Sequence, residues 1–284
     1  MKVEVRNVTK RYKRKTALHN ISLQIDEPKI YALLGRNGAG KTTLMELIAG
    51  HILPTEGEII INGVDPFDER SILKEICLIK ENDNFHKDLK VKDVLQTYAN
   101  FYEKWNDTLA TQLIESYNLP LNARVKALSK GMESALGVIV GLASGAKLTI
   151  FDEPYIGMDA IGRQQFYNQL VEVFEAEERT ILFSTHLIDE ASLLFQEIFI
   201  INNGELILEE DAETIRVKAY AVMGQKKEVE AYIKGKKVLR TKQLSNMLVA
   251  YLYDDKGDLP DTLQVDGVPI QEVMIYLTEM EGVS

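Results

Sequence analysis

The sequence predicts an α/β fold built on a largely parallel sheet. Over the first two thirds of the chain, short apolar runs rich in β-branched residues alternate with longer segments of helical period. Two of these runs, 148–151 and 180–183, contain almost no alternating polar residues, which is typical of strands buried on both faces. The expected strands are 30–34, 58–61, 76–79, 148–151, 180–183 and 198–201.

Helical periodicity marks the segments between these strands. The run 41–49 follows the first expected strand, and 91–102 has the same 3.6-residue pattern. The stretch 84–145 is mostly helical in period and carries aromatic residues in its first third. We therefore expect a helical insertion into the α/β core.

The composition changes after Asn203-Gly204, a pair that favours a tight hairpin turn. From about residue 211 the pattern predicts a small α+β appendage, with a strand over 247–253 and a helix over 270–280. We expect two units, an N-terminal one over 1–210 and a regulatory or dimerisation domain over 211–284.

Charge and cysteine content exclude several classes of function. The 284 residues include 33 Lys and Arg against 43 Asp and Glu, which gives a net charge of −10. A chain this acidic is a poor candidate for broad nucleic-acid binding, where phosphate contacts dominate affinity. The single cysteine, Cys77, excludes an internal disulfide and fits a reducing compartment. The longest uncharged apolar stretch, near 134–146, is shorter than the roughly 18–20 residues of a spanning helix, so another chain would have to cross a membrane.

A glycine-rich loop lies between the first expected strand and its helix, which is the context that a phosphate-binding loop requires. Glycines let backbone N–H groups surround a phosphate, and the helix N-terminus adds favourable partial charge. Lys41 would hold the β- and γ-phosphates, and the Thr42 hydroxyl would hold Mg²⁺. The alternative is a strand-to-helix turn that binds nothing. The candidate residues are Gly35, Arg36, Asn37, Gly38, Ala39, Gly40, Lys41, Thr42 and Thr43.

Two adjacent carboxylates end the apolar run 148–151. Asp152 lies where a side chain would reach Mg²⁺, most simply through water. Glu153 would orient or deprotonate a water that attacks the γ-phosphate. An exposed acidic turn is the alternative.

Two weaker motifs complete the set. Ser129-Lys130-Gly131 precedes a helical run, where such residues form an anion site or simply cap the helix. His186 follows the strand 180–183, at an edge where ligands bind in open α/β sheets, so it is a candidate for contact with the γ-phosphate or for a structural role.

Together these motifs resemble one family, the ATP-binding subunits of ABC transporters. The resemblance covers about residues 1–210 and implies a P-loop NTPase core with ATP and Mg²⁺ as cofactors. The loop 156–160 resembles the D-loop of the family, which makes Asp159 a candidate nucleotide contact, and Tyr12 occupies the position that stacks on adenine. The matching segments, in order, are 35–42, 128–132, 148–153, 156–160 and His186.

The resemblance also implies partners. Two ATP-binding chains, identical or paralogous, would face head to tail, with each ATP between Lys41 of one chain and Ser129 and Gly131 of the other. A membrane-spanning subunit would hold this pair at the cytoplasmic face of the cell membrane, and no nucleic acid would be involved. The groove that receives the membrane subunit would include residues 81–95, with Phe85, and the aromatic residues up to Trp105; core packing of these aromatics is the alternative.

Three positions depart from the family pattern. Glu81, or a close neighbour, occupies the place of a glutamine, where it would ligate Mg²⁺ and contribute to catalysis but add negative charge beside the phosphates. Lys130 stands in the signature segment, and we hypothesise that its charge partly offsets Glu81. Ala160 replaces a proline that fixes a turn, which we expect to be tolerated.

The Ser-Lys-Gly-Met signature and the acidic residue resemble a subgroup of Gram-positive exporters for antibiotics, bacitracin-like peptides or amphipathic toxins such as phenol-soluble modulins. Segment 269–278 resembles the terminal helix of that subgroup. The alternatives are a soluble ABC ATPase of DNA repair or translation and an ATP-gated sensor; a small-molecule kinase would leave Ser129 and His186 unexplained.

Overall fold

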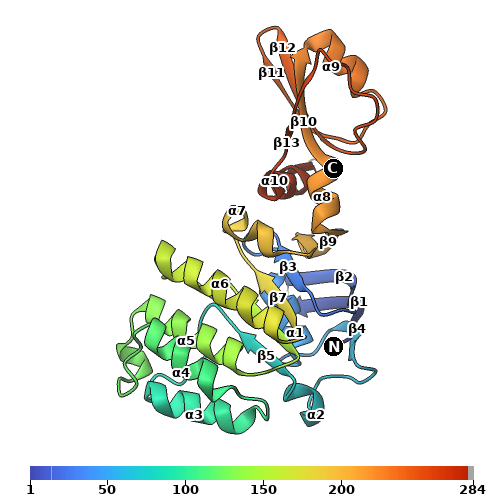
Figure 1. The fold of residues 1–284 in the computed structure, drawn as a ribbon. Coiled ribbons are helices and arrows are strands. Elements are labelled where there is room, and N and C mark those ends of the chain that lie inside the picture. Colours follow the sequence, from blue (N-terminus) through green and yellow to red (C-terminus); the bar gives the residue numbers. More distant parts are fainter. Residues whose placement is uncertain (14, 281–284) are drawn as a thin grey trace.

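A six-stranded sheet lies at the centre of the computed structural model, which describes residues 1–13 and 15–280 (Figure 1). The strand order is β5-β6-β7-β3-β8-β9, and the first five strands are parallel while β9 pairs antiparallel with β8. The expected parallel sheet is confirmed. Its strands are β3 (Ile30–Leu34), β5 (Ile76–Ile79), β6 (Leu148–Asp152), β7 (Thr180–Ser184), β8 (Glu197–Asn202) and β9 (Glu205–Asp211).

The central strands are apolar throughout because both faces of the sheet are covered. On β3, Tyr31 and Leu33 belong to one apolar cluster, whereas Ala32 and Leu34 belong to the other. The first cluster includes α1 (Lys41–Ile48), and the second includes α5 (Lys130–Ala143) and α6 (Ala160–Ala176). Alternate side chains of a strand point to opposite faces, so each strand contributes to two cores.

A three-stranded antiparallel sheet covers the α1 side, in the order β2-β1-β4. Its strands are β1 (Val3–Tyr12), β2 (Lys15–Ile25) and β4 (Glu56–Ile61). The expectation that 58–61 belongs with the parallel strands is therefore wrong. This segment pairs with β1, Ile59 opposite Val5 and Ile61 opposite Val3, and only alternate residues are buried, as in a sheet that packs on one face.

Helices dominate the region between β5 and β6, as expected. They are α3 (Val91–Phe101), α4 (Asp107–Ser116), the 3₁₀ turn Val125–Ala127 and α5, with the short α2 (Arg70–Leu73) before β5. Phe85 is 7% exposed and meets Tyr98 edge-on at 5.8 Å between ring centroids. Of the two alternatives, core packing holds for Phe85 and the free groove does not, because its ring belongs to the core of this region. Of the aromatic residues there, Phe101 remains 46% exposed.

Asn203 and Gly204 both have positive φ, 49° and 84°, and form the expected hairpin turn between β8 and β9. After β9, α8 (Ala212–Lys218) leads to an antiparallel sheet of order β11-β12-β10-β13. The strands of this sheet are β10 (Ala219–Gln225), β11 (Val238–Leu244), β12 (Met247–Tyr253) and β13 (Gln264–Gly267), and α9 (Lys226–Tyr232) follows β10. The predicted strand 247–253 is confirmed.

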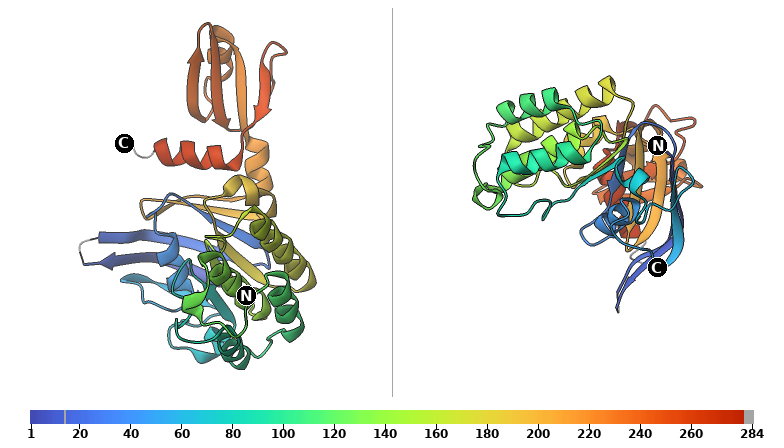
Figure 2. Two further views of the ribbon diagram at one scale, coloured as in Figure 1. Left: turned by 90° about the vertical axis from the view of Figure 1, so that its left-hand side faces the viewer. Right: turned by 90° about the horizontal axis from the view of Figure 1, so that it is seen from below.

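The C-terminal sheet and α9 stand apart from the central sheet, with α8 and α10 (Ile270–Met280) between them (Figures 1 and 2). The sheet has its own apolar cluster around Tyr220, Val222 and Leu252. Helix α10, predicted at 270–280, belongs to the large central cluster and contacts α7 (Ile188–Ala191), which precedes the 3₁₀ turn Ser192–Leu194. Within the described ranges, no helix is long and apolar enough to span a bilayer.

Candidate nucleotide site

A cavity of about 660 Å³ opens at the carboxyl edge of β3, β6 and β7, where open α/β sheets bind ligands. From the glycine-rich loop and the start of α1, its lining includes Asn37, Gly38, Gly40, Lys41, Thr42 and Thr43. From other segments, it includes Tyr12, Glu81, Asp152, Glu153 and His186. The structure thus gathers eleven predicted site residues from five segments around one cavity.

The other predicted residues lie outside this lining. Within the glycine-rich loop, they are Gly35, Arg36 and Ala39. Ser129 caps α5 by accepting a hydrogen bond from the Met132 N–H at 3.2 Å, and Asp159 caps α6 through the Gly162 N–H at 2.8 Å. Lys130 and Gly131 begin α5, beside Gly157 of the loop before α6.

The glycine-rich loop needs glycine for two physical reasons. Gly40 has φ of 113°, and a Cβ there would lie 2.7 Å from the Ala17 carbonyl oxygen. Gly35 has φ of 153°, and a Cβ would lie 2.3 Å from the Ile201 oxygen. Both the left-handed backbone and the close approach of neighbouring strands exclude other side chains, so the loop stays open toward the cavity.

Lys41 lies at the first turn of α1 and is 7% exposed. Its ammonium donates to the carbonyl oxygens of Gly35 at 2.8 Å and Arg36 at 3.4 Å. Burial lowers the pKa of Lys41, and the charges of Glu153 and Asp152 oppose that shift. An anion bound in the cavity would provide a negative charge that stabilises the buried Lys41 ammonium.

Asp152 joins the loop to the sheet. Its Oδ2 accepts from the Thr42 hydroxyl and its Oδ1 from the Ser184 hydroxyl, both at 2.5 Å. Asp152 is 3% exposed and Ser184 is fully buried. The sequence reasoning missed Ser184, which ends β7 two residues before His186. A hydroxyl at the end of a buried strand was the available signal.

Glu153 and His186 form the second polar pair of the cavity. The His186 Nδ1 lies 2.6 Å from Glu153 Oε2, and the His186 N–H lies 3.4 Å from the same oxygen. Glu153 adopts a left-handed φ of 52° while its own N–H donates to Ser184 Oγ at 3.2 Å. Such a conformation costs about 1–3 kcal/mol for a non-glycine residue and recurs at functional sites.

Lys130 and Glu81, whose charges we hypothesise to offset each other in part, are joined through the Glu81 backbone. The Lys130 ammonium donates to the Glu81 backbone carbonyl at 2.8 Å and also contacts the Asn82 side-chain oxygen. The Glu81 carboxylate accepts from the Asn82 amide at 3.0 Å instead. Lys130 thus holds the backbone of the 81–82 loop within its own chain.

The donor set fits the cofactors that the sequence predicts. Thr42 provides a hydroxyl oxygen and Asp152 a carboxylate oxygen, which are hard ligands of the kind that Mg²⁺ prefers. The glycine-rich backbone, the buried Lys41 and the exposed ring of Tyr12 at the rim provide for phosphates and a base. The residues present therefore suit a magnesium nucleotide.

Comparisons with known proteins agree with this geometry. The ABC transporter family model matches residues 18–156. A lantibiotic transport ATP-binding protein of Streptococcus pyogenes is 33% identical over 210 residues, which span 74% of this chain and 90% of that protein. An uncharacterized ABC transporter ATP-binding protein of Bacillus subtilis is 32% identical over 207 residues, spanning 72% and 67%.

Solved structures show the same fold. An ATP-binding subunit of an ABC transporter has a TM-score of 0.68 at 25% identity and covers 76% of this chain and 92% of its own. A dimeric ATP-binding cassette in a post-hydrolysis state with ADP and Pi has a TM-score of 0.66 at 24% identity, covering 74% and 98%. The chain therefore belongs to the ATP-binding subunits of ABC transporters, a family of ATP-hydrolysing enzymes.

Proposed function

We propose that this chain binds MgATP in the 660 Å³ cavity and that Glu153 acts on the attacking water during hydrolysis. The observation that carries the proposal is the end of β6. There, two adjacent carboxylates diverge: Asp152 is bonded to Thr42 of the phosphate loop, and Glu153 is bonded to His186. This divergence supports a metal-binding role for Asp152 and a water-activating role for Glu153.

Each residue of the cavity has a distinct task in this scheme. Lys41 holds the β- and γ-phosphates, Thr42 and Asp152 hold Mg²⁺, and His186 orients Glu153 and the γ-phosphate. Mg²⁺ supplies charge neutralisation of the phosphate oxygens when it is bound. Tyr12, at the rim, stacks on the adenine.

The second half of the site comes from a second chain. Ser129, Gly131 and Asp159 lie outside the cavity lining of their own chain, and Ser129 is exposed at the N-terminus of α5. A helix N-terminus with an exposed hydroxyl suits the phosphates of an ATP held by another copy. We infer a head-to-tail pair of this chain with itself or a paralogue, with ATP at the shared surface.

Substitution of Glu153 by Gln tests the catalytic assignment. The amide keeps the size of the side chain but is a far weaker base, so we expect phosphate release to fall by about 100-fold or more. The same variant should accumulate as an ATP-bound dimer in size-exclusion chromatography. Glu75→Gln is the matched control, because Glu75 pairs with Lys147 at the surface, away from the cavity. Wild-type hydrolysis by Glu153→Gln would refute the assignment.

We further propose that the pair powers export of amphipathic peptides or related antibiotics through a separate membrane-spanning subunit, at the cytoplasmic membrane face. The similarity to a lantibiotic transport ATP-binding protein supports this choice. Co-expression with a candidate multi-span membrane subunit tests it. We expect co-purification from detergent and ATP-dependent peptide uptake into inverted vesicles, and the Glu153→Gln pair should abolish that uptake.

A soluble ABC ATPase or ATP-gated sensor is the second candidate, favoured by one observation. Glu81 lies in the cavity lining and adds a third carboxylate near the phosphates. We propose that Glu81 serves as a further Mg²⁺ ligand and that Lys130, by holding its backbone carbonyl, fixes its position. Glu81→Gln should raise the Mg²⁺ concentration needed for half-maximal hydrolysis, because it removes an anionic metal ligand. A lower Mg²⁺ requirement would contradict the ligand role and would show that Glu81 acts by repelling the phosphates.

A further inference from the structure

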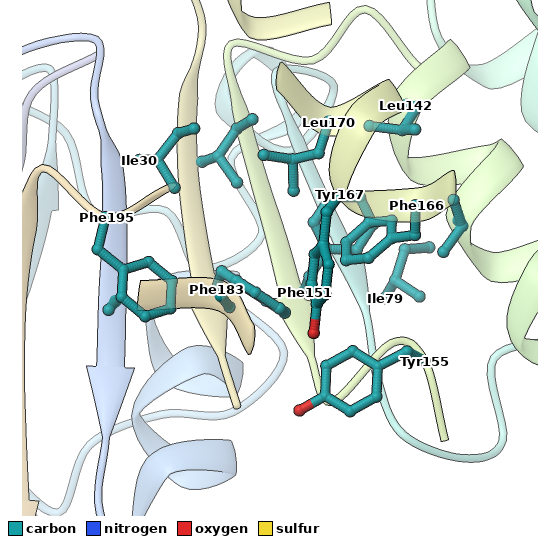
Figure 3. Close-up of a cluster of buried hydrophobic side chains, with 14 of the residues drawn as sticks. Ile30, Ile79, Leu142, Phe151, Tyr155, Phe166, Tyr167, Leu170, Phe183 and Phe195 are labelled. Carbon is teal, nitrogen blue, oxygen red and sulfur yellow. The ribbon is translucent and has the colours of Figure 1, made fainter. Parts of the chain in front are cut away.

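Tyr155, two residues after Glu153, carries a buried hydroxyl for which the proposed reaction has so far no role. The side chain is 2% exposed, and its ring packs edge-on against Phe183 at 6.1 Å and Tyr167 at 6.3 Å between centroids. Figure 3 shows the Tyr155 ring at the edge of this aromatic cluster. These neighbours therefore fix the orientation of the Tyr155 ring. The Tyr155 hydroxyl contacts Glu153 Oε2 at 2.7 Å and also contacts the Thr185 hydroxyl.

The directions of these hydrogen bonds follow from counting protons. The Leu187 N–H donates to Thr185 Oγ1 at 2.9 Å, and a carboxylate only accepts. The single hydroxyl proton of Tyr155 therefore goes to Glu153, and that of Thr185 goes to Tyr155. The result is a directed chain from a backbone N–H through two hydroxyls to the carboxylate, in which each bond polarises the next.

The chain leaves the two oxygens of Glu153 in different environments. Oε2 accepts from the Tyr155 hydroxyl and faces His186 Nδ1, whereas the described residues provide no hydrogen bond to Oε1. Glu153 lines the cavity. Burial and, after it, the charge of Glu153 raise the pKa of Tyr155 above its usual value, so the phenol keeps the proton that it donates.

We propose that Tyr155 is a positioning residue for hydrolysis, which holds Glu153 Oε2 so that Oε1 is presented to the attacking water. The inference rests on the proposed role of Glu153 in hydrolysis. Thr185 acts through Tyr155 by orienting its hydroxyl. Glu153 directly follows the last residue of β6 and has a left-handed φ of 52°. The contacts of Oε2 with Tyr155 and His186 hold its side chain there.

A matched pair of substitutions separates positioning from packing. Tyr155→Phe removes only the hydroxyl that contacts Glu153. Tyr167→Phe removes a hydroxyl from a residue that is 4% exposed in the same cluster, and that hydroxyl has no hydrogen-bond partner among the described residues. Both variants keep their rings and thus the aromatic packing.

We expect Tyr155→Phe to lower kcat about 10- to 100-fold, because a displaced catalytic group loses reactive geometry. The KM for ATP and the affinity for a fluorescent ATP analogue should stay within about twofold, since Glu153 acts after binding. Tyr167→Phe should leave kcat unchanged. Equal kcat for Tyr155→Phe and Tyr167→Phe would overturn the proposal.

Thr185 provides a second route if Tyr155→Phe fails to fold. Thr185→Val breaks the chain but keeps the shape of the side chain, and Thr185→Ser keeps the hydroxyl. We expect kcat to fall in the first variant and to recover in the second, with KM unchanged in both. A loss of kcat that Thr185→Ser does not restore would contradict the chain of hydrogen bonds.

The Glu153→Gln background distinguishes this inference from the proposed function. There, Tyr155→Phe should cause no further loss of residual phosphate release, because the group that it positions is absent. A further loss of the wild-type size would show that Tyr155 acts elsewhere. Wild-type turnover by Glu153→Gln alone would refute the role of Glu153, whereas an inactive Glu153→Gln beside a fully active Tyr155→Phe would refute only the positioning role.

Discussion

The carboxyl edge of the six-stranded sheet and the four-stranded C-terminal sheet bury different kinds of side chain. At the first, Asp152, Glu153 and Ser184 are all at most 8% exposed. At the second, Val222 and Leu252 are fully buried in an apolar cluster. Buried charges cost several kcal/mol each in desolvation, whereas a buried aliphatic side chain contributes about 1.5–3 kcal/mol of stability. The nucleotide edge thus holds groups for chemistry, and the C-terminal sheet holds groups for stability.

Substitution of Lys41 by Ala should give the largest effect, and it should affect function and leave stability nearly unchanged. It removes the one buried cation of the cavity lining, so ATP affinity and turnover should both fall by about 100-fold or more. Thermal stability should change little, because burial already lowers the pKa of Lys41 and disfavours its charge. Nucleotide titration and a melting curve measure both quantities, with Lys147→Ala as the surface control. A large loss of stability would contradict the distinction.

Substitution of Leu252 by Ala should have the opposite profile. Leu252 is fully buried in the C-terminal cluster, and its truncation should cost about 2–5 kcal/mol of unfolding free energy through lost contacts and a cavity. The rate of ATP hydrolysis should stay within about twofold of wild type, because the substitution is distant from the nucleotide site. Denaturant unfolding monitored by tyrosine fluorescence and an ATPase assay test the two parts. A parallel fall in hydrolysis would show that the two regions are coupled.

A pair of Gly→Ala substitutions sharpens the contrast with a smaller effect. At Gly40, the new Cβ meets the Ala17 carbonyl at 2.7 Å in a left-handed backbone, so we expect about 1–3 kcal/mol of destabilisation and loss of ATP binding. At Gly224, the one contact under 3.4 Å among the described residues is with the Leu263 Cδ2, at 2.4 Å, and a rotamer change can relieve it. We expect less than about 1.5 kcal/mol there, with unchanged ATP binding. Equal effects would contradict this account.

The reactivity of Cys77 should show the smallest effect. Cys77 lies on β5, which packs against α5, and is 1% exposed. Burial raises its pKa to about 11. The thiolate is the reactive form, so native protein should resist iodoacetamide at pH 8 and gain reactivity only as pH approaches 11. Because the folded state retains this proton, its contribution to stability is present below the unfolded pKa and is lost as pH rises from about 9 toward 11.

The sequence alone predicted the parallel sheet and the identity of most cavity residues. Buried strands such as 148–152 have no polar alternation, and a glycine-rich loop before Lys41 is typical of phosphate binding. Both patterns can be recognised from a few consecutive residues. The predictions that failed depended on neighbours. Segment 58–61 has the sequence of a strand, but the sequence does not show which sheet it joins, and its partner β1 is distant in the chain. For Phe85, the sequence is the same whether the ring is exposed or packed on Tyr98.

The remaining features of the site are tertiary. The sequence by itself indicated which residues could bind phosphate and metal and where the five parallel strands lie, because backbone propensity and side-chain chemistry act over a few residues. Only the folded chain decided that Tyr155 and Thr185 would hold Glu153, and that Lys130 would hold the backbone of Glu81. Tyr155 and Thr185 are 30 residues apart, and Lys130 and Glu81 are 49 residues apart. Only the packing of helices and strands against a common sheet sets the distances between such segments.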